Sequence, residues 1–164
     1  TGARFAYQRY EGVGLPDIVV TAKPLAGGLP LGATIFSERA AAGVETGSHG
    51  TTFGGGPLAC AVALEALDLI DELLPNVRAS GAYLHQALRR LQQRHSVITE
   101  IRGAGLMAGI QLSVAGDALV EACLARGLAI NCTHETVLRL LPPYIVTAVE
   151  IDEAMEILDA VLPA

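Results

Sequence analysis

A short apolar run, Asp17-Ile-Val-Val-Thr-Ala-Lys23, ends at the only lysine of the chain and leads into a glycine-rich turn, Gly27-Gly-Leu-Pro-Leu-Gly32. Its β-branched residues predict a buried strand over 17–22, and a second strand over 32–36 follows the turn. All the other basic side chains are arginines. A primary amine can condense with an aldehyde, whereas a guanidinium cannot. Lys23 is therefore a candidate nucleophile at a strand end, and the alternative is a solvated surface charge.

The composition is that of a globular protein that buries a core, with 164 residues, a net charge of -6 and 51% hydrophobic side chains. The basic residues form no cluster, which argues against nucleic acid as a partner. No apolar run is long enough for a membrane span and no signal peptide is visible, so we expect a cytosolic protein. The cysteines and histidines lack metal-type spacing, so no metal site is predicted.

The chain divides at a change of composition. Small and hydroxyl residues dominate 43–56, and Pro57 then opens a helical pattern. Pro75 is predicted to end this helix, because proline cannot donate the next backbone hydrogen bond. Asn76 is predicted to cap a second helix. We therefore place a domain boundary after Pro75.

The two predicted domains differ in architecture. Residues 1–75 are predicted to complete the edge of a larger α/β sheet, and residues 76–164 to form a smaller α+β domain. Thr147 and Glu150 have capping-box spacing before a last amphipathic helix. The other elements predicted after the boundary are strands near 97–102, 106–113, 128–131 and 136–141, and a helix over 116–126. Thr1 lies in the middle of a segment, so we expect a C-terminal piece of a longer protein.

Two further segments could bind an anion. The loop Gly50-Thr-Thr-Phe-Gly-Gly55 places threonine hydroxyls and backbone N–H groups before a helix start, where a phosphate ester can be held, although such loops are also common connectors. Arg139 lies in Val137-Leu-Arg-Leu-Leu141, and a strand there would point Val137, Arg139 and Leu141 to one face. The Arg139 guanidinium needs a partner, which is either a structural carboxylate or the carboxylate of a substrate.

Four groups of residues follow one another along the chain. They are Pro16-Asp17-Ile18 with Thr21-Ala22-Lys23 and Gly27 to Ala33; His49 to Gly55 with Pro57-Leu58-Ala59; Arg102 to Gly109; and Val137 to Tyr144. Together they resemble the class III pyridoxal-phosphate aminotransferases through essentially the whole chain. Ile130-Asn131-Cys132-Thr133 is most similar to the acetylornithine aminotransferases of arginine biosynthesis. The resemblance implies the C-terminal part of a fold-type I transferase that depends on pyridoxal 5'-phosphate.

The resemblance also implies a role for each candidate residue. Lys23 corresponds to the lysine that binds the cofactor aldehyde and later moves a proton, as nucleophile and general base in turn. Thr52, next to Thr51, corresponds to the threonine that reaches the cofactor phosphate of the neighbouring subunit, which implies a homodimer with shared active sites. Arg139 corresponds to the arginine that binds the α-carboxylate of glutamate and 2-oxoglutarate. The implied reaction moves an amino group from N-acetylornithine to 2-oxoglutarate.

Some features depart from the family pattern. Pro24 follows the lysine where a small residue is usual, and it is predicted to hold Lys23 in an extended conformation. Gly56 replaces a usual asparagine. The family's phosphate cup, stacking aromatic ring and pyridine-binding aspartate all precede Thr1, so this chain alone is expected to be inactive. Ornithine, succinylornithine and 4-aminobutyrate aminotransferases are alternatives, and so is a truncated, non-catalytic dimerisation module.

Overall fold

The computed structural model describes residues 1–163, which form two compact units. The N-terminal unit comprises Tyr7–Glu72, and the C-terminal unit comprises Thr1–Ala6 and the chain from Leu73 onward. The division lies close to Pro75, where the sequence places a boundary. The N-terminal unit begins at Tyr7 and ends at Glu72, whereas the predicted domain spans residues 1–75. The first six residues belong to the C-terminal unit instead.

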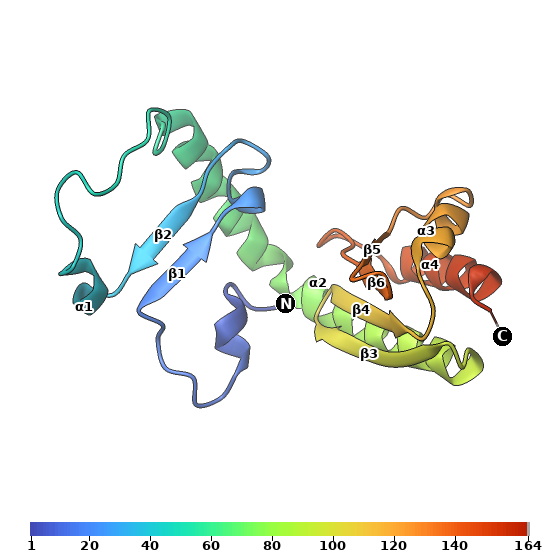
Figure 1. Cartoon of the computed structure of the whole chain (residues 1–164). Helices are drawn as coiled ribbons and strands as arrows, with labels where there is room; N and C mark the ends of the chain where they lie inside the picture. Colours follow the sequence, from blue (N-terminus) through green and yellow to red (C-terminus); the bar gives the residue numbers. More distant parts are fainter. Residues whose placement is uncertain (164) are drawn as a thin grey trace. The chain divides into compact units, whose positions relative to one another are not determined.

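The N-terminal unit contains an antiparallel ribbon of two strands, β1 (Ile18–Thr21) and β2 (Ala33–Phe36), which lie side by side in Figure 1. Both strands fall within the predicted ranges, because the β-branched runs between glycine and proline specify them locally. The predicted burial is wrong for the described residues, since Ile18, Val20 and Ile35 are exposed. The short helices that precede the long α2 helix are η1 (Ala6–Arg9) and η2 (Lys23–Ala26), both 3₁₀, and α1 (Glu38–Ala41). The unit's small core consists of Leu25, Ala26 and Ala63.

Helix α2 (Pro57–Arg94) is one continuous helix of 38 residues. It begins at Pro57 as predicted, but the predicted stop at Pro75 and the predicted cap at Asn76 are wrong. Proline inside a helix costs about 3 kcal/mol. Four almost completely buried side chains beyond it outweigh that cost, because each contributes about 1.5–3 kcal/mol. These side chains are Val77, Leu84, Leu88 and Leu91.

The C-terminal unit contains an antiparallel sheet with the strand order β3-β4-β6-β5. Its strands are β3 (Ile98–Ala104), β4 (Met107–Leu112), β5 (Asn131–Thr133) and β6 (Val137–Leu140). Helix α3 (Asp117–Leu124) follows β4, and helix α4 (Ala148–Val161) follows β6. Strand β5 begins at Asn131, so the predicted range 128–131 is too early. The predicted capping box is confirmed, since the Thr147 hydroxyl accepts from the Glu150 N–H and the Glu150 carboxylate accepts from the Thr147 N–H.

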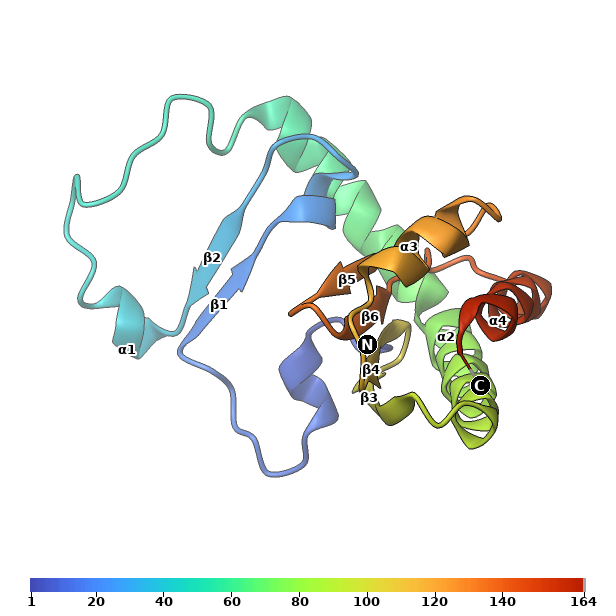
Figure 2. The same cartoon turned by 45° about the vertical axis from the view of Figure 1, so that its right-hand side comes forward.

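One face of this sheet is buried and the other is open. Strands β4 and β6 alternate, so that Ile110 and Leu138 enter the core with Leu88 of α2 and Leu158 of α4. Figure 2 shows α2 and α4 lying next to each other beside the sheet. The intervening residues of β4 and β6 belong to the opposite face. Arg139 is one of them, so the core helices leave it accessible.

The ends of α2 and α4 are joined by a polar cluster around His95. The His95 side chain is 10% exposed, with Nδ1 2.9 Å from the Pro163 carbonyl and Nε2 2.7 Å from the Asp159 carboxylate. Arg94 also donates to Asp159, at 2.9 Å. The hydrogen bond from His95 and the charge of Arg94 hold the pKa of Asp159 below its ordinary value.

We expect Asp159→Asn to destabilise the C-terminal unit at neutral pH but not in strong acid. The pKa of Asp159 is lower in the folded chain than the ordinary 3.8. Its contribution is therefore complete above the unfolded pKa and disappears as the pH falls through the folded pKa. Urea unfolding should show a gap between the two proteins at about pH 7 that narrows as the pH is lowered below the ordinary pKa of 3.8. Glu156→Gln, an exposed change on the same helix, should show no such gap; a gap of equal size in acid would contradict the prediction.

Candidate active site

Lys23 lies two residues after the end of β1, at the start of η2, and its side chain is exposed. Its φ of 56° lies in the left-handed region, so the predicted extended conformation is wrong. The chain must turn sharply at this residue, because Leu25 and Ala26 enter the core against Ala63 immediately after the strand. A non-glycine residue held in this region costs roughly 1–3 kcal/mol, and such strain is concentrated at functional sites.

The predicted anion-binding loop lies between α1 and α2 and is exposed along its length. Thr51 and Thr52 both present their side chains to solvent, just before α2 begins at Pro57. Phe53 is 89% exposed beside them.

Arg139 lies on β6 with its side chain partly buried, as the strand prediction requires. Its Nε donates to the Asn131 Oδ1 of the neighbouring strand β5 at 3.1 Å. Within residues 1–163 no carboxylate lies within ion-pair distance of Arg139, so the structural carboxylate that the sequence allowed is absent from the described chain. Leu141 lies one residue beyond the end of β6, and its side chain is 57% exposed, whereas Leu140 before it is 5% exposed.

A hollow of about 420 Å³ lies on the open face of the sheet. Its lining includes Arg139, Arg102 and Gly109, on three neighbouring strands. Arg102 already has partners, because it donates to the Glu100 carboxylate at 2.7 Å and to the Gln111 amide at 3.1 Å. Among the described residues, Arg139 is therefore the arginine of this hollow that carries no compensating negative charge. Arg102 and Asn131 were not predicted as site neighbours, because strand pairing across the chain is needed to place them beside Arg139.

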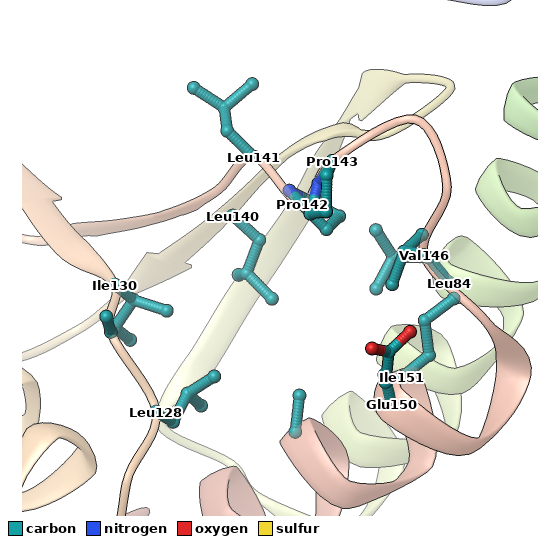
Figure 3. A pocket seen from close by; sticks show the side chains of 12 residues that line it. Leu84, Leu128, Ile130, Leu140, Leu141, Pro142, Pro143, Val146, Glu150 and Ile151 are labelled. Carbon is teal, nitrogen blue, oxygen red and sulfur yellow. The ribbon is translucent and has the colours of Figure 1, made fainter.

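A second hollow, of about 310 Å³, lies on the other side of β6 (Figure 3). Apolar side chains such as Leu84, Leu128 and Leu140 converge on it, and the Glu150 carboxylate lies at its margin. That carboxylate is occupied by the capping box, and the hydrogen bonds from Thr147 hold its pKa below the ordinary value. Glu150 therefore caps a helix, and we assign it no ligand.

The candidate residues occupy both units. Lys23, Thr51 and Thr52 belong to the N-terminal unit, whereas Arg139 belongs to the C-terminal unit. Within residues 1–163, no group of three histidine, cysteine, aspartate or glutamate side chains is placed to bind a metal. In the same residues no helix has both the length and the apolar composition of a membrane span.

The family description "Aminotransferase class-III" matches residues 1–162. The chain belongs to the class III aminotransferases. It is 45% identical over 163 residues to the acetylornithine aminotransferase of Methanocaldococcus jannaschii, covering 98% of this chain and 40% of that protein. The chain thus spans about two fifths of the length of the curated relatives that it matches.

Solved structures of aminotransferases show the same fold. The acetylornithine aminotransferase of Elizabethkingia anophelis matches with a TM-score of 0.87 and 31% identity, over 99% of this chain and 42% of that chain. The ornithine delta-aminotransferase of Plasmodium falciparum matches with a TM-score of 0.89 and 30% identity, over 98% of this chain and 42% of that chain. The predicted fold, the C-terminal part of the aminotransferase architecture, is therefore confirmed.

Proposed function

We propose that this chain is the C-terminal part of an aminotransferase that uses pyridoxal 5'-phosphate to move an amino group from N-acetylornithine to 2-oxoglutarate, a step of arginine biosynthesis. The observation that carries the proposal is the position of Lys23. In a chain that matches the class III family, the only lysine lies two residues after β1, exposed and in a strained backbone conformation. Relatives named acetylornithine aminotransferase support the choice of substrate.

The residues present fit the cofactor. Lys23 offers an accessible primary amine for its aldehyde, and Thr51 and Thr52 offer accessible hydroxyls for its phosphate. When bound, the cofactor supplies an electron-withdrawing ring that makes the proton on the amine-bearing carbon of the substrate acidic. Lys23 is the base that accepts and returns this proton. Arg139 binds the α-carboxylate of glutamate and of 2-oxoglutarate through its uncompensated guanidinium.

We also propose a homodimer in which Thr52 serves the active site of the neighbouring subunit. The exposed loop supports this role, because Phe53 presents a large apolar surface that a second subunit would cover.

The cytoplasm is the compartment we propose, since the described cysteines, Cys60, Cys123 and Cys132, are all unpaired. Burial raises the pKa of the Cys123 thiol, which keeps it unreactive.

The amino donor is tested with the full-length protein that contains this chain. Glutamate formation from 2-oxoglutarate is measured with N-acetylornithine, ornithine, succinylornithine and 4-aminobutyrate as donors. We expect kcat/KM to be highest with N-acetylornithine, by about tenfold or more over the other donors. A preference for ornithine would overturn the substrate assignment but not the reaction, and the similarity to the Plasmodium falciparum enzyme makes ornithine the second candidate.

A further inference from the structure

Arg139 lies in a row of four residues that crosses the open face of the sheet. The strand register pairs Arg102 with Gly109, Gly109 with Arg139, and Arg139 with Asn131. Residues that pair directly across neighbouring strands project from the same face. Gly109 has no side chain, so the two arginines flank a gap in the row. Asn131 closes the row on the other side of Arg139.

The two arginines of this row have chemically different partners. Glu100 gives Arg102 a negative charge at 2.7 Å, which compensates its guanidinium. Asn131 gives Arg139 a neutral amide oxygen at 3.1 Å, which orients the guanidinium and leaves its charge intact. An anion that enters the hollow is therefore attracted to Arg139 rather than to Arg102.

The contact also decides which edge of the guanidinium is free. A guanidinium can bind a carboxylate with its Nη1/Nη2 edge or with its Nε/Nη edge. Asn131 occupies Nε–H, so the Nη1/Nη2 edge is left for a carboxylate. Holding Nε also restricts rotation of the planar group, which reduces the entropy lost when a carboxylate binds.

We infer that Asn131 is a positioning residue, which orients Arg139 for the carboxylate beside the reacting carbonyl of 2-oxoglutarate. The inference rests on the proposed function. In 2-oxoglutarate the carbonyl adjoins a carboxylate, whereas the reacting amine of N-acetylornithine lies at the opposite end from its carboxylate. Asn131 therefore acts in the half-reaction with the oxo acid and not in the half-reaction with the amino donor.

The test uses Asn131→Ala and Asn131→Asp in the full-length protein. We expect Asn131→Ala to raise KM for 2-oxoglutarate about tenfold with little change in kcat, because the guanidinium loses its orientation. Asn131→Asp keeps the shape but adds a negative charge, as Glu100 does for Arg102. It should raise that KM about a hundredfold, because the new carboxylate competes with the substrate for the guanidinium. Asn76→Ala, at the chain's other asparagine, should leave KM unchanged.

Two substrates separate positioning from a merely structural role. Succinic semialdehyde is 2-oxoglutarate without the carboxylate beside the carbonyl, so its KM should be the same in Asn131→Ala and in the unsubstituted protein. The single-turnover rate with N-acetylornithine should also be unchanged. The inference would be overturned if Asn131→Ala impaired the reactions of 2-oxoglutarate, succinic semialdehyde and N-acetylornithine equally, or if it impaired none of them. If Arg139→Ala leaves KM for 2-oxoglutarate unchanged, the proposed role of Arg139 fails instead.

A second measurement needs no catalysis and can be made on this chain. The Nε–H of Arg139 should exchange with solvent more slowly than the Nε–H of the exposed Arg89, as seen in spectra of protein labelled with ¹⁵N-arginine. Asn131→Ala should remove that difference, whereas Asn131→Asp should keep it. Rapid exchange of the Arg139 Nε–H in the unsubstituted chain would show that the hydrogen bond does not form, and the inference would fail.

Discussion

Replacing Lys23 with arginine is expected to lower transamination by the full-length protein by roughly 10⁴-fold or more. Arginine keeps the positive charge and a similar length, but a guanidinium neither condenses with an aldehyde nor gives up its proton near neutral pH. The change therefore removes the covalent attachment and the general base together. Glutamate formation in the steady state measures the loss. Activity within tenfold of the unsubstituted protein would exclude Lys23 from the chemistry.

The same residue can be tested on this chain without turnover. After incubation with pyridoxal 5'-phosphate and reduction with borohydride, peptide mapping should find the label on Lys23 in preference to the α-amino group. The control is Lys23→Arg combined with Arg89→Lys, which moves the only lysine to an exposed position on α2. That protein should label much more weakly. Equal labelling would mean that Lys23 is merely an accessible amine, and absent labelling would favour the non-catalytic module.

Changing Gly103 to alanine is expected to lower the free energy of unfolding of the C-terminal unit by about 3 kcal/mol. Gly103 has a φ of 137°, where residues with a side chain are strained. A Cβ atom there would also overlap the Met107 carbonyl oxygen on the paired strand. The backbone of the β3-β4 hairpin must move to relieve this contact. Urea unfolding of the chain, followed by circular dichroism, measures the change.

Gly109→Ala is the matched control for Gly103→Ala, because both glycines lie in the segment from Arg102 to Gly109. Gly109 lies outside the left-handed region, and a Cβ there would be 3.5 Å from Val137 Cγ1, an ordinary contact. Its substitution should cost less than about 1 kcal/mol. Equal losses for the two variants would show that the motif is generally intolerant of side chains. In that case the backbone conformation at Gly103 would not be the cause.

Local signals in the sequence predicted much of the fold. The strands around Lys23 and the capping box at Thr147 depend on neighbouring residues, so their patterns were sufficient. The predicted helix end at Pro75 was wrong because the tendency of proline to end a helix is outweighed by packing further along the same helix, where Leu84 and Leu88 are buried. The extended backbone predicted for Lys23 was wrong for the same reason. Burial of the residues after Lys23 forces a turn there, although a following proline disfavours it.

The candidate site was less predictable than the fold. Lys23 is a distinctive residue type in this chain, and the Arg139 strand has a clear alternation, so both could be proposed as site residues from the sequence. The residues beside Arg139 on the sheet are set by the pairing of β6 with β4 and β5. A shift of one residue in either pairing would place other residues beside it. Register is not a local property, so neither Asn131 nor the compensated Arg102 could be placed beforehand.

The β1-β2 ribbon has a practical consequence for handling this chain. Among the described residues each of its strands pairs only with the other, and it exposes Ile18, Val20, Ile35 and Phe36. Two-stranded ribbons are marginally stable in water, and their free edges accept strands from other molecules. Preparations at high concentration should therefore be limited by aggregation through this ribbon, so dilute samples and mild solubilising additives are the sensible starting conditions.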